Sequence, residues 1–135
     1  ELKFLKEVLL LKPFNALDLE IYYKGERELT DFRIMCYAKY GKNYRKIGLY
    51  TPDFLIIQRK NNQIYKILII ETKGSGFAEQ SSFQLRKQFI EREFLQFNNE
   101  KFGYAKFDFL LLQDDQKLAD NMGKLQGKVS TFFTE

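Results

Sequence analysis

Apolar side chains recur at spacings of three and four along residues 2–12, the period of a helix with one buried face. Pro13 ends this pattern, because proline disrupts a helix interior, so we predict a first helix over residues 2–12. Residues 17–23 alternate between apolar and polar positions, which indicates a half-buried strand. A short helix capped by Asn15 is the alternative for that segment.

Two further segments predict an antiparallel hairpin. Residues 32–40 are rich in aromatic and branched side chains, which suit a pleated surface. Residues 41–43 contain a glycine and an asparagine, which tight turns favour, and residues 47–50 follow as the returning strand.

Two short runs in the middle of the chain are apolar at every position. Residues 54–57 read FLII and residues 67–70 read ILII, and such runs are typical of strands that are covered on both faces. The polar residues 59–63 turn between them. We expect these two strands to form the centre of the sheet.

The second half of the chain predicts a crossover helix. It follows a glycine-containing segment, begins with Ser81 or Ser82 as its cap, and runs to residue 99. One helical stripe is apolar and is expected to pack into the core: Phe83, Ile90, Phe94 and Phe97.

Residues 107–113 predict one more strand, which a right-handed crossover would make parallel to the strand before the helix. Residues 114–135 indicate a weaker helix and a tail. With 135 residues, of which 44% are hydrophobic, the chain fits a single folded domain. Because it opens with Glu1 and not with Met, we expect it to be a piece of a longer protein.

The composition excludes several classes of chemistry. The sequence has no histidine and one cysteine, Cys36, so Ser-His-Asp and Cys-His catalysis, an intrachain disulfide and a zinc site are excluded. No apolar run is long enough for a membrane span or a secretion signal, and we expect a cytoplasmic protein without membrane contact. The net charge of +4 gives a mild preference for anionic partners.

Polar side chains stand at the ends of the two central strands. Asp53 directly precedes the first strand, and Glu71 and Lys73 end the second. Since side chains alternate along a strand, Glu71 and Lys73 point to the same face. If the two strands run antiparallel, the start of one lies beside the end of the other, and Asp53 then faces Glu71.

Two neighbouring carboxylates repel each other, and one lysine offsets only one of the two negative charges. A divalent cation would neutralise the pair, and oxygen ligands suit Mg²⁺ or Mn²⁺, which also bind substrate phosphate oxygens. Such an ion lowers the pKa of a bound water, and Lys73 would orient that water or neutralise charge on the phosphate. These residues therefore predict hydrolysis of phosphodiester bonds.

The segments YTPDF at residues 50–54 and IIETKG at residues 69–74 resemble the PD-(D/E)xK nuclease superfamily. Within it, they look like the nuclease domain of helicase-type restriction subunits, as in type III enzymes. The similarity covers a core of residues 1–113 and leaves residues 114–135 without a counterpart. It implies a restriction-endonuclease-like α/β core, with a mixed central β-sheet flanked by helices, and Mg²⁺-dependent DNA cleavage by Asp53, Glu71 and Lys73.

The resemblance also implies roles for residues outside this motif. A glutamate on the first helix of that family often helps to hold the metal, and Glu7 is the best match, with Glu20 as its rival and a solvated surface position as the alternative. The backbone carbonyl of Thr72 is expected as a further metal ligand. Lys87, on the helix after the central strands, is expected to contact DNA phosphate, with plain solvation as the alternative.

A basic stretch lies in the predicted hairpin. Residues 39–46 contain no acidic side chain, and they predict contacts with DNA backbone phosphates through Lys42, Arg45 and Lys46. A solvated hairpin tip explains the same pattern equally well.

Together these features predict a metal-dependent DNA endonuclease domain of a restriction enzyme. We expect double-stranded DNA as its substrate and a helicase or translocase domain of the same or an associated chain as its partner, with dimer formation as a route to double-strand cleavage. The alternative from a different class is a catalytically silent DNA-binding or docking module of the same fold. A nuclease that acts on RNA or on branched DNA is a third interpretation of the same sequence features.

Overall fold

The computed structural model of the chain describes residues 16–23, 34–50, 52–73, 81–113 and 118–134. The helix predicted over residues 2–12 lies outside these ranges. In the described ranges, strands and helices form a mixed α/β fold, and no helix there has the length and apolar composition needed to cross a membrane.

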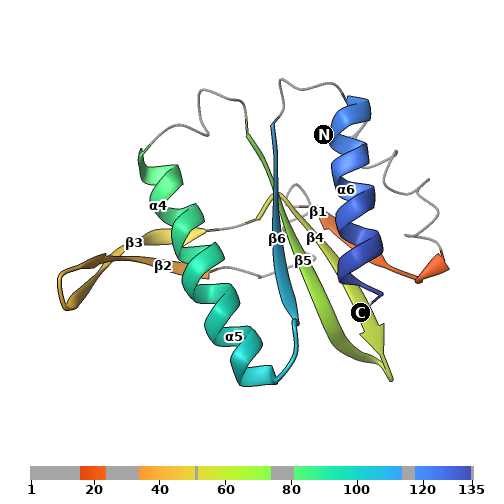
Figure 1. Cartoon of the computed structure of the whole chain (residues 1–135), viewed down its shortest axis with the longest axis horizontal. Helices are drawn as coiled ribbons and strands as arrows, with labels where there is room; N and C mark the ends of the chain where they lie inside the picture. The colour runs from red at the N-terminus through yellow and green to blue at the C-terminus, as the bar shows by residue number, and fades with distance from the viewer. Residues whose placement is uncertain (1–15, 24–33, 51, 74–80, 114–117, 135) are drawn as a thin grey trace.

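The main sheet has four strands, and its centre is a long antiparallel hairpin (Figure 1). Strands β4 (Phe54–Lys60) and β5 (Gln63–Lys73) form this hairpin. Strand β1 (Glu20–Tyr23) pairs antiparallel with β4, and β6 (Phe107–Gln113) pairs parallel with β5. The order β1-β4-β5-β6 is therefore a mixed sheet, and the predicted central strands and parallel last strand are confirmed.

The two central strands are apolar on both faces because both faces are covered. All residues of the runs 54–57 and 67–70 are buried, as predicted. The turn between the strands is shorter than residues 59–63, since only Asn61 and Asn62 form it, with φ of 54° and 64°. Two successive residues with positive φ make a tight turn that matches the twist of the strands, so the neighbouring polar residues belong to the strands.

The strand predicted over residues 17–23 is shorter in the structure. Strand β1 begins only at Glu20, because Leu17 and Asp18 form a turn in which Asp18 adopts a φ of 52°. Ala16, just before this turn, is helical. The segment thus combines one helical position, which belongs to the alternative interpretation, with a short edge strand.

A second, two-stranded sheet extends sideways from the main sheet (Figure 1). Strands β2 (Ile34–Tyr40) and β3 (Asn43–Tyr50) form it and pair antiparallel, so the predicted hairpin is confirmed. Its turn begins with Gly41, which has a φ of 61° that glycine adopts without strain. We refer to residues 34–50 as the ribbon.

One face of the main sheet is covered by a continuous helical segment (Figure 1). It consists of helix α4 (Ser81–Phe89), the π-helical turn η2 (Ile90–Phe94) and helix α5 (Leu95–Phe102), and it is longer than the predicted helix. The core on this face draws its buried residues from both sheets and from this segment: Ile34, Cys36, Tyr50, Leu55, Ile57, Ile67, Ile69, Ile90, Phe107 and Phe109.

The apolar stripe predicted on this helical segment is wrong at Phe97. Its side chain is 60% exposed, whereas that of Ile90 is fully buried. A π-helical turn holds more residues than an α-helical turn, so η2 rotates every later position about the helix axis and moves Phe97 to the surface. The side chains of the predicted caps, Ser81 and Ser82, lie outside the described part of the chain.

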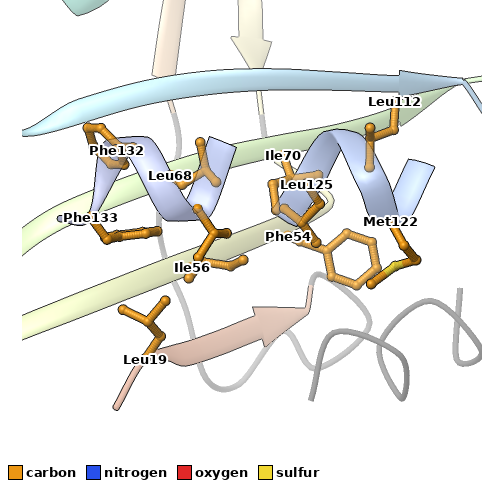
Figure 2. Packing of buried hydrophobic residues seen from close by; sticks show 11 residues of the cluster. Leu19, Phe54, Ile56, Leu68, Ile70, Leu112, Met122, Leu125, Phe132 and Phe133 are labelled. Atoms are coloured by element: carbon orange, nitrogen blue, oxygen red, sulfur yellow. The ribbon is translucent and has the colours of Figure 1, made fainter. Parts of the chain in front are cut away.

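Helix α6 (Leu118–Phe132) covers the other face of the main sheet (Figure 2). The helix predicted within residues 114–135 is thus present, and it buries Met122, Leu125, Val129 and Phe132 against the central strands. The exposed Gly123 and Gly127 lower its helical propensity. Burial of its apolar face therefore supplies the stability that the local sequence lacks.

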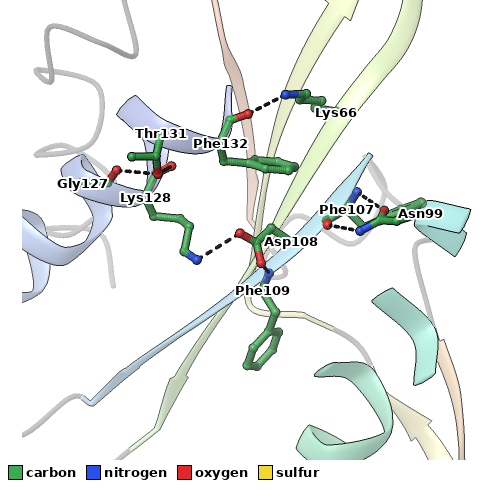
Figure 3. A network of polar contacts seen from close by, with 9 residues as sticks. All are labelled: Lys66, Asn99, Phe107, Asp108, Phe109, Gly127, Lys128, Thr131 and Phe132. Atoms are coloured by element: carbon green, nitrogen blue, oxygen red, sulfur yellow. Dashed lines mark hydrogen bonds and ion pairs between the residues drawn. The ribbon is translucent and has the colours of Figure 1, made fainter. Parts of the chain in front are cut away.

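Polar contacts fasten the C-terminal half of α6 to the sheet (Figure 3). The ammonium group of Lys66, a residue that is 2% exposed, donates to the carbonyl oxygen of Phe132 at 2.6 Å. Lys128 pairs with Asp108 of β6 at 3.0 Å. A cation at a helix C-terminus satisfies a carbonyl that has no partner within the helix, so Lys66 anchors α6 near the start of β5.

Candidate active site

The paired strands β4 and β5 bring two carboxylates together. Phe54 pairs with Ile70 in the antiparallel register, so Asp53, one residue before β4, lies beside Glu71, one residue after Ile70. Both side chains are buried, with 6% and 2% of their surface exposed. The antiparallel arrangement on which the sequence prediction depended is therefore present.

Asp53 is held by Thr72 of the neighbouring strand. Its Oδ2 accepts a hydrogen bond from the backbone N–H of Thr72 at 3.0 Å and another from the Thr72 hydroxyl at 2.9 Å. Pro52 precedes Asp53 and has no N–H to donate to a strand partner, and the chain bends at Asp53 before β4 begins. The carboxylate thus has a defined place at the entrance of β4.

The sequence analysis missed a further member of this group. The hydroxyl of Tyr50, the last residue of β3, donates to Oε2 of Glu71 at 2.5 Å. Tyr50 is 6% exposed and belongs to the ribbon, not to the main sheet. No periodic pattern links a tyrosine to Glu71, because the contact joins two separate sheets. We refer to Tyr50, Asp53, Glu71 and Thr72 as the carboxylate cluster.

The electrostatics of Tyr50 indicate that these groups share one buried space. Burial raises the pKa of the Tyr50 hydroxyl well above its usual range, and the charge of Glu71 and the hydrogen bond to it raise the pKa further. The charge of Asp53 acts in the same direction. Both carboxylates therefore lie close to the hydroxyl, and Tyr50 stays a neutral hydrogen-bond donor at neutral pH.

Lys73 is the last residue of β5, and its backbone pairs with Gln113 of β6. It follows Glu71 by two positions, so its backbone lies at the same end of the main sheet as the carboxylate cluster. Its side chain is outside the described part of the structure, and the role predicted for its amine stays a prediction.

The donor set of the carboxylate cluster fits a hard divalent cation. Asp53 and Glu71 offer carboxylate oxygens, the ligands that Mg²⁺ and Mn²⁺ prefer. Within the described ranges, no group of three acidic, cysteine or histidine side chains is gathered in one place. Glu7, the predicted additional ligand, lies outside those ranges, and coordination by the carbonyl of Thr72 stays a prediction.

Glu20, the rival of Glu7, is not brought to the cluster. It pairs with Ile57, which lies roughly 13 Å along β4 from Asp53 at about 3.3 Å per residue. Its carboxylate instead pairs with Arg59 and accepts a hydrogen bond from the hydroxyl of Tyr22 at 2.9 Å.

The basic residues predicted to contact DNA fall into two different environments. Lys42, Arg45 and Lys46 are exposed on the ribbon. Lys87 of α4 pairs with Glu91, four residues later on the same helical segment, at 3.0 Å. The charge of Lys87 is thus partly neutralised, whereas the ribbon presents its charges to solvent.

Arg86, the neighbour of Lys87, points toward the ribbon. A Cβ atom at Gly48 would stand 3.3 Å from Nη2 of Arg86, and Gly48 has a φ of 135°, so glycine at this position leaves room for the guanidinium group. Burial raises the pKa of the nearby Cys36 to about 11, and the charge of Arg86 opposes part of this rise.

The buried Nε of Arg86 has no hydrogen-bond acceptor among the described residues, and such an N–H favours an anion. Sequence reasoning missed Arg86.

The end of the main sheet thus combines two buried carboxylates and a tyrosine hydroxyl that donates to one of them, while the guanidinium group of Arg86, on α4, lies against Gly48 of the ribbon. Carboxylate oxygens hold a divalent cation, and a guanidinium group attracts a phosphate. Comparison of the chain with protein-family models, with curated proteins and with solved structures found no match.

Proposed function

We propose that this chain is a metal-dependent DNA endonuclease domain that hydrolyses phosphodiester bonds. The observation that supports the proposal most directly is the register of β4 and β5, in which Asp53 lies beside Glu71 and both are buried. Two such carboxylates repel each other unless a positive charge joins them. A divalent cation is the partner that their oxygens select.

In this proposal Asp53 and Glu71 bind Mg²⁺, for which Mn²⁺ substitutes, and Glu7 and the carbonyl of Thr72 are further ligands. The bound ion supplies Lewis acidity, which lowers the pKa of a water and stabilises charge on a phosphate oxygen. Lys73 orients the attacking water or neutralises charge that develops on the scissile phosphate. The two hydrogen bonds from Thr72 keep Asp53 in place throughout.

The strand order supports a restriction-endonuclease-like core. Among the described elements, the antiparallel strands β1, β4 and β5 are followed by a helical crossover and by β6, which is parallel to β5. The ribbon is inserted between β1 and β4 in this series. A mixed central sheet flanked by helices is what the resemblance of residues 50–54 and 69–74 to PD-(D/E)xK nucleases implies.

Double-stranded DNA is the proposed substrate. The exposed ribbon residues Lys42, Arg45 and Lys46 offer charges to backbone phosphates, and the net charge of +4 favours a polyanion. A helicase or translocase domain of the same or an associated chain would bring the domain to its target in the cytoplasm. Two copies acting together would cut both strands.

A cleavage assay tests the proposal. The chain is incubated with linear and with supercoiled DNA, in the presence of Mg²⁺, Mn²⁺ or EDTA. Asp53→Asn is the informative variant, because its amide oxygen still accepts both hydrogen bonds from Thr72 while the charge is lost. We expect wild type to cut with either ion and to bind Mn²⁺ saturably, and Asp53→Asn to do neither. Undiminished cutting by Asp53→Asn refutes the proposal. DNA binding by wild type without cleavage or Mn²⁺ binding supports the silent binding module instead.

A further inference from the structure

One hydrogen bond joins the two sheets at the carboxylate cluster. It runs from the hydroxyl of Tyr50 to Oε2 of Glu71, residues that are 21 positions apart in the chain. Tyr50 is held in the ribbon, where its backbone pairs with Ile34. Glu71 is held in the main sheet, where it pairs with Leu111 of β6. The donor and the acceptor are thus fixed by different sheets.

Packing alone does not require the hydroxyl of Tyr50. The ring lies in the core cluster that also contains Ile34, Cys36 and Ile69, and a phenylalanine ring would fill the same space without needing a hydrogen-bond partner. The oxygen–oxygen distance of 2.5 Å is typical of a hydroxyl that donates to an ionised carboxylate. The hydroxyl therefore acts on Glu71 itself.

Each carboxylate of the cluster accepts a hydrogen bond from a residue of another strand. Thr72 holds Oδ2 of Asp53, and Tyr50 holds Oε2 of Glu71. Such contacts to metal ligands fix their orientation, and losing one typically lowers metal affinity by about 10- to 100-fold. We infer that Tyr50 is a positioning residue, which orients the carboxylate of Glu71 to bind a divalent cation together with Asp53.

This inference rests on the proposed function, and Tyr50→Phe tests it because the variant removes the hydroxyl and keeps the ring. Mn²⁺ binding to the chain without DNA is measured by titration calorimetry and by the electron spin resonance signal of the free ion. We expect the dissociation constant to rise by about 10- to 100-fold. The Mg²⁺ concentration that gives half-maximal cleavage should rise by a similar factor.

Tyr44→Phe is the matched control, because Tyr44 lies on the same ribbon with 51% of its surface exposed. It should leave Mn²⁺ affinity unchanged. A second measurement needs no variant: in the NMR spectrum of the wild-type chain, the hydroxyl proton of Tyr50 should shift as Mg²⁺ is added, with the midpoint at the dissociation constant of the ion. A proton that does not move overturns the inference even if Tyr50→Phe does not fold.

The failure of this inference is distinguishable from the failure of the proposed function. If Tyr50→Phe is folded and binds Mn²⁺ as wild type does, while Asp53→Asn loses binding, Tyr50 has only a packing role and the metal site stands. If Asp53→Asn also binds Mn²⁺ as wild type does, the proposed function itself is refuted. A weaker site in Tyr50→Phe together with an unchanged Tyr44→Phe supports the inference.

Discussion

Thr72 donates twice to one carboxylate oxygen of Asp53, from its backbone N–H at 3.0 Å and from its hydroxyl at 2.9 Å. Asp53 directly precedes β4 and Thr72 lies on the neighbouring strand β5, so this contact ties the entrance of β4 to the end of β5. It also fixes one of the two buried acids on which the proposed chemistry depends. The contact therefore connects the stability of the sheet with the geometry of the candidate active site.

Thr72→Val separates the two donors, because valine keeps the branched shape and the backbone N–H but loses the hydroxyl. We expect the free energy of unfolding in urea to fall by about 1 kcal/mol, and the cleavage rate to fall because Asp53 is held less firmly. Thr131→Val is the control, since the hydroxyl of Thr131 donates only to carbonyls within the exposed part of α6. An unchanged cleavage rate in Thr72→Val would show that the hydroxyl has no role in the site.

Lys73→Ala is expected to abolish cleavage while the fold survives, because in the proposed function the amine acts on the attacking water or the scissile phosphate. Gel assays of DNA cleavage and circular dichroism measure the two quantities. Lys101→Ala, which removes an exposed lysine from α5, should cut as wild type does. Full activity in Lys73→Ala would contradict the assignment of this residue.

Arg86 and Lys87 are neighbours in different electrostatic environments, so we expect their substitution to affect DNA binding differently. Arg86→Gln should weaken binding and reduce the slope of log affinity against log salt by about one, because its buried Nε has no hydrogen-bond acceptor among the described residues and such an N–H favours an anion. Lys87→Gln should have a smaller effect, since Lys87 already pairs with Glu91. Fluorescence anisotropy over a salt series measures both slopes, and equal losses would contradict the distinction.

The exposed ribbon residues should contribute to DNA affinity without affecting the metal site. Replacing Lys42, Arg45 and Lys46 together by glutamine is expected to reduce the salt slope by up to about three, close to one for each lost phosphate contact. The free energy of unfolding should change by less than about 0.5 kcal/mol, as is usual for surface substitutions. Mn²⁺ affinity without DNA should be unchanged. If the triple variant binds DNA as tightly as wild type does, these three side chains are only solvated and do not contact DNA.

Cys36 is fully buried, and burial raises its pKa from 9.0 to about 11. The folded state therefore favours the neutral thiol, and this contribution to stability is complete below pH 9 and is lost as pH rises through 11. In wild type the free energy of unfolding should fall more steeply between these two values than in Cys36→Ala. Below pH 9 the thiol should react with iodoacetamide only after unfolding, and rapid alkylation of the folded chain would contradict its burial.

The local pattern of the sequence determined the centre of the fold. Uninterrupted apolar runs such as residues 54–57 are typical of strands with both faces covered, and in the structure these residues form such a strand. The condition that the two central strands run antiparallel was also enough to predict Asp53 beside Glu71. These predictions succeed because they depend on strand geometry, which repeats every two residues.

Other features needed the folded chain because they depend on packing. Phe97 fits the helical stripe in the sequence, yet the π-helical turn η2 rotates it to the surface. Helix α6 looks weak by composition, because it contains Gly123 and Gly127, and burial of its apolar face stabilises it. Neither outcome is encoded in the local period of the chain.

The sequence by itself determined which residues carry acidic and basic chemistry and which strands hold them. Only the tertiary structure decided their partners: Tyr50 reaches Glu71 from another sheet, and Arg86 rather than Lys87 turns toward the ribbon. The physical reason is that contacts between separately formed elements depend on how these elements pack against each other. No periodic pattern along the chain specifies that packing.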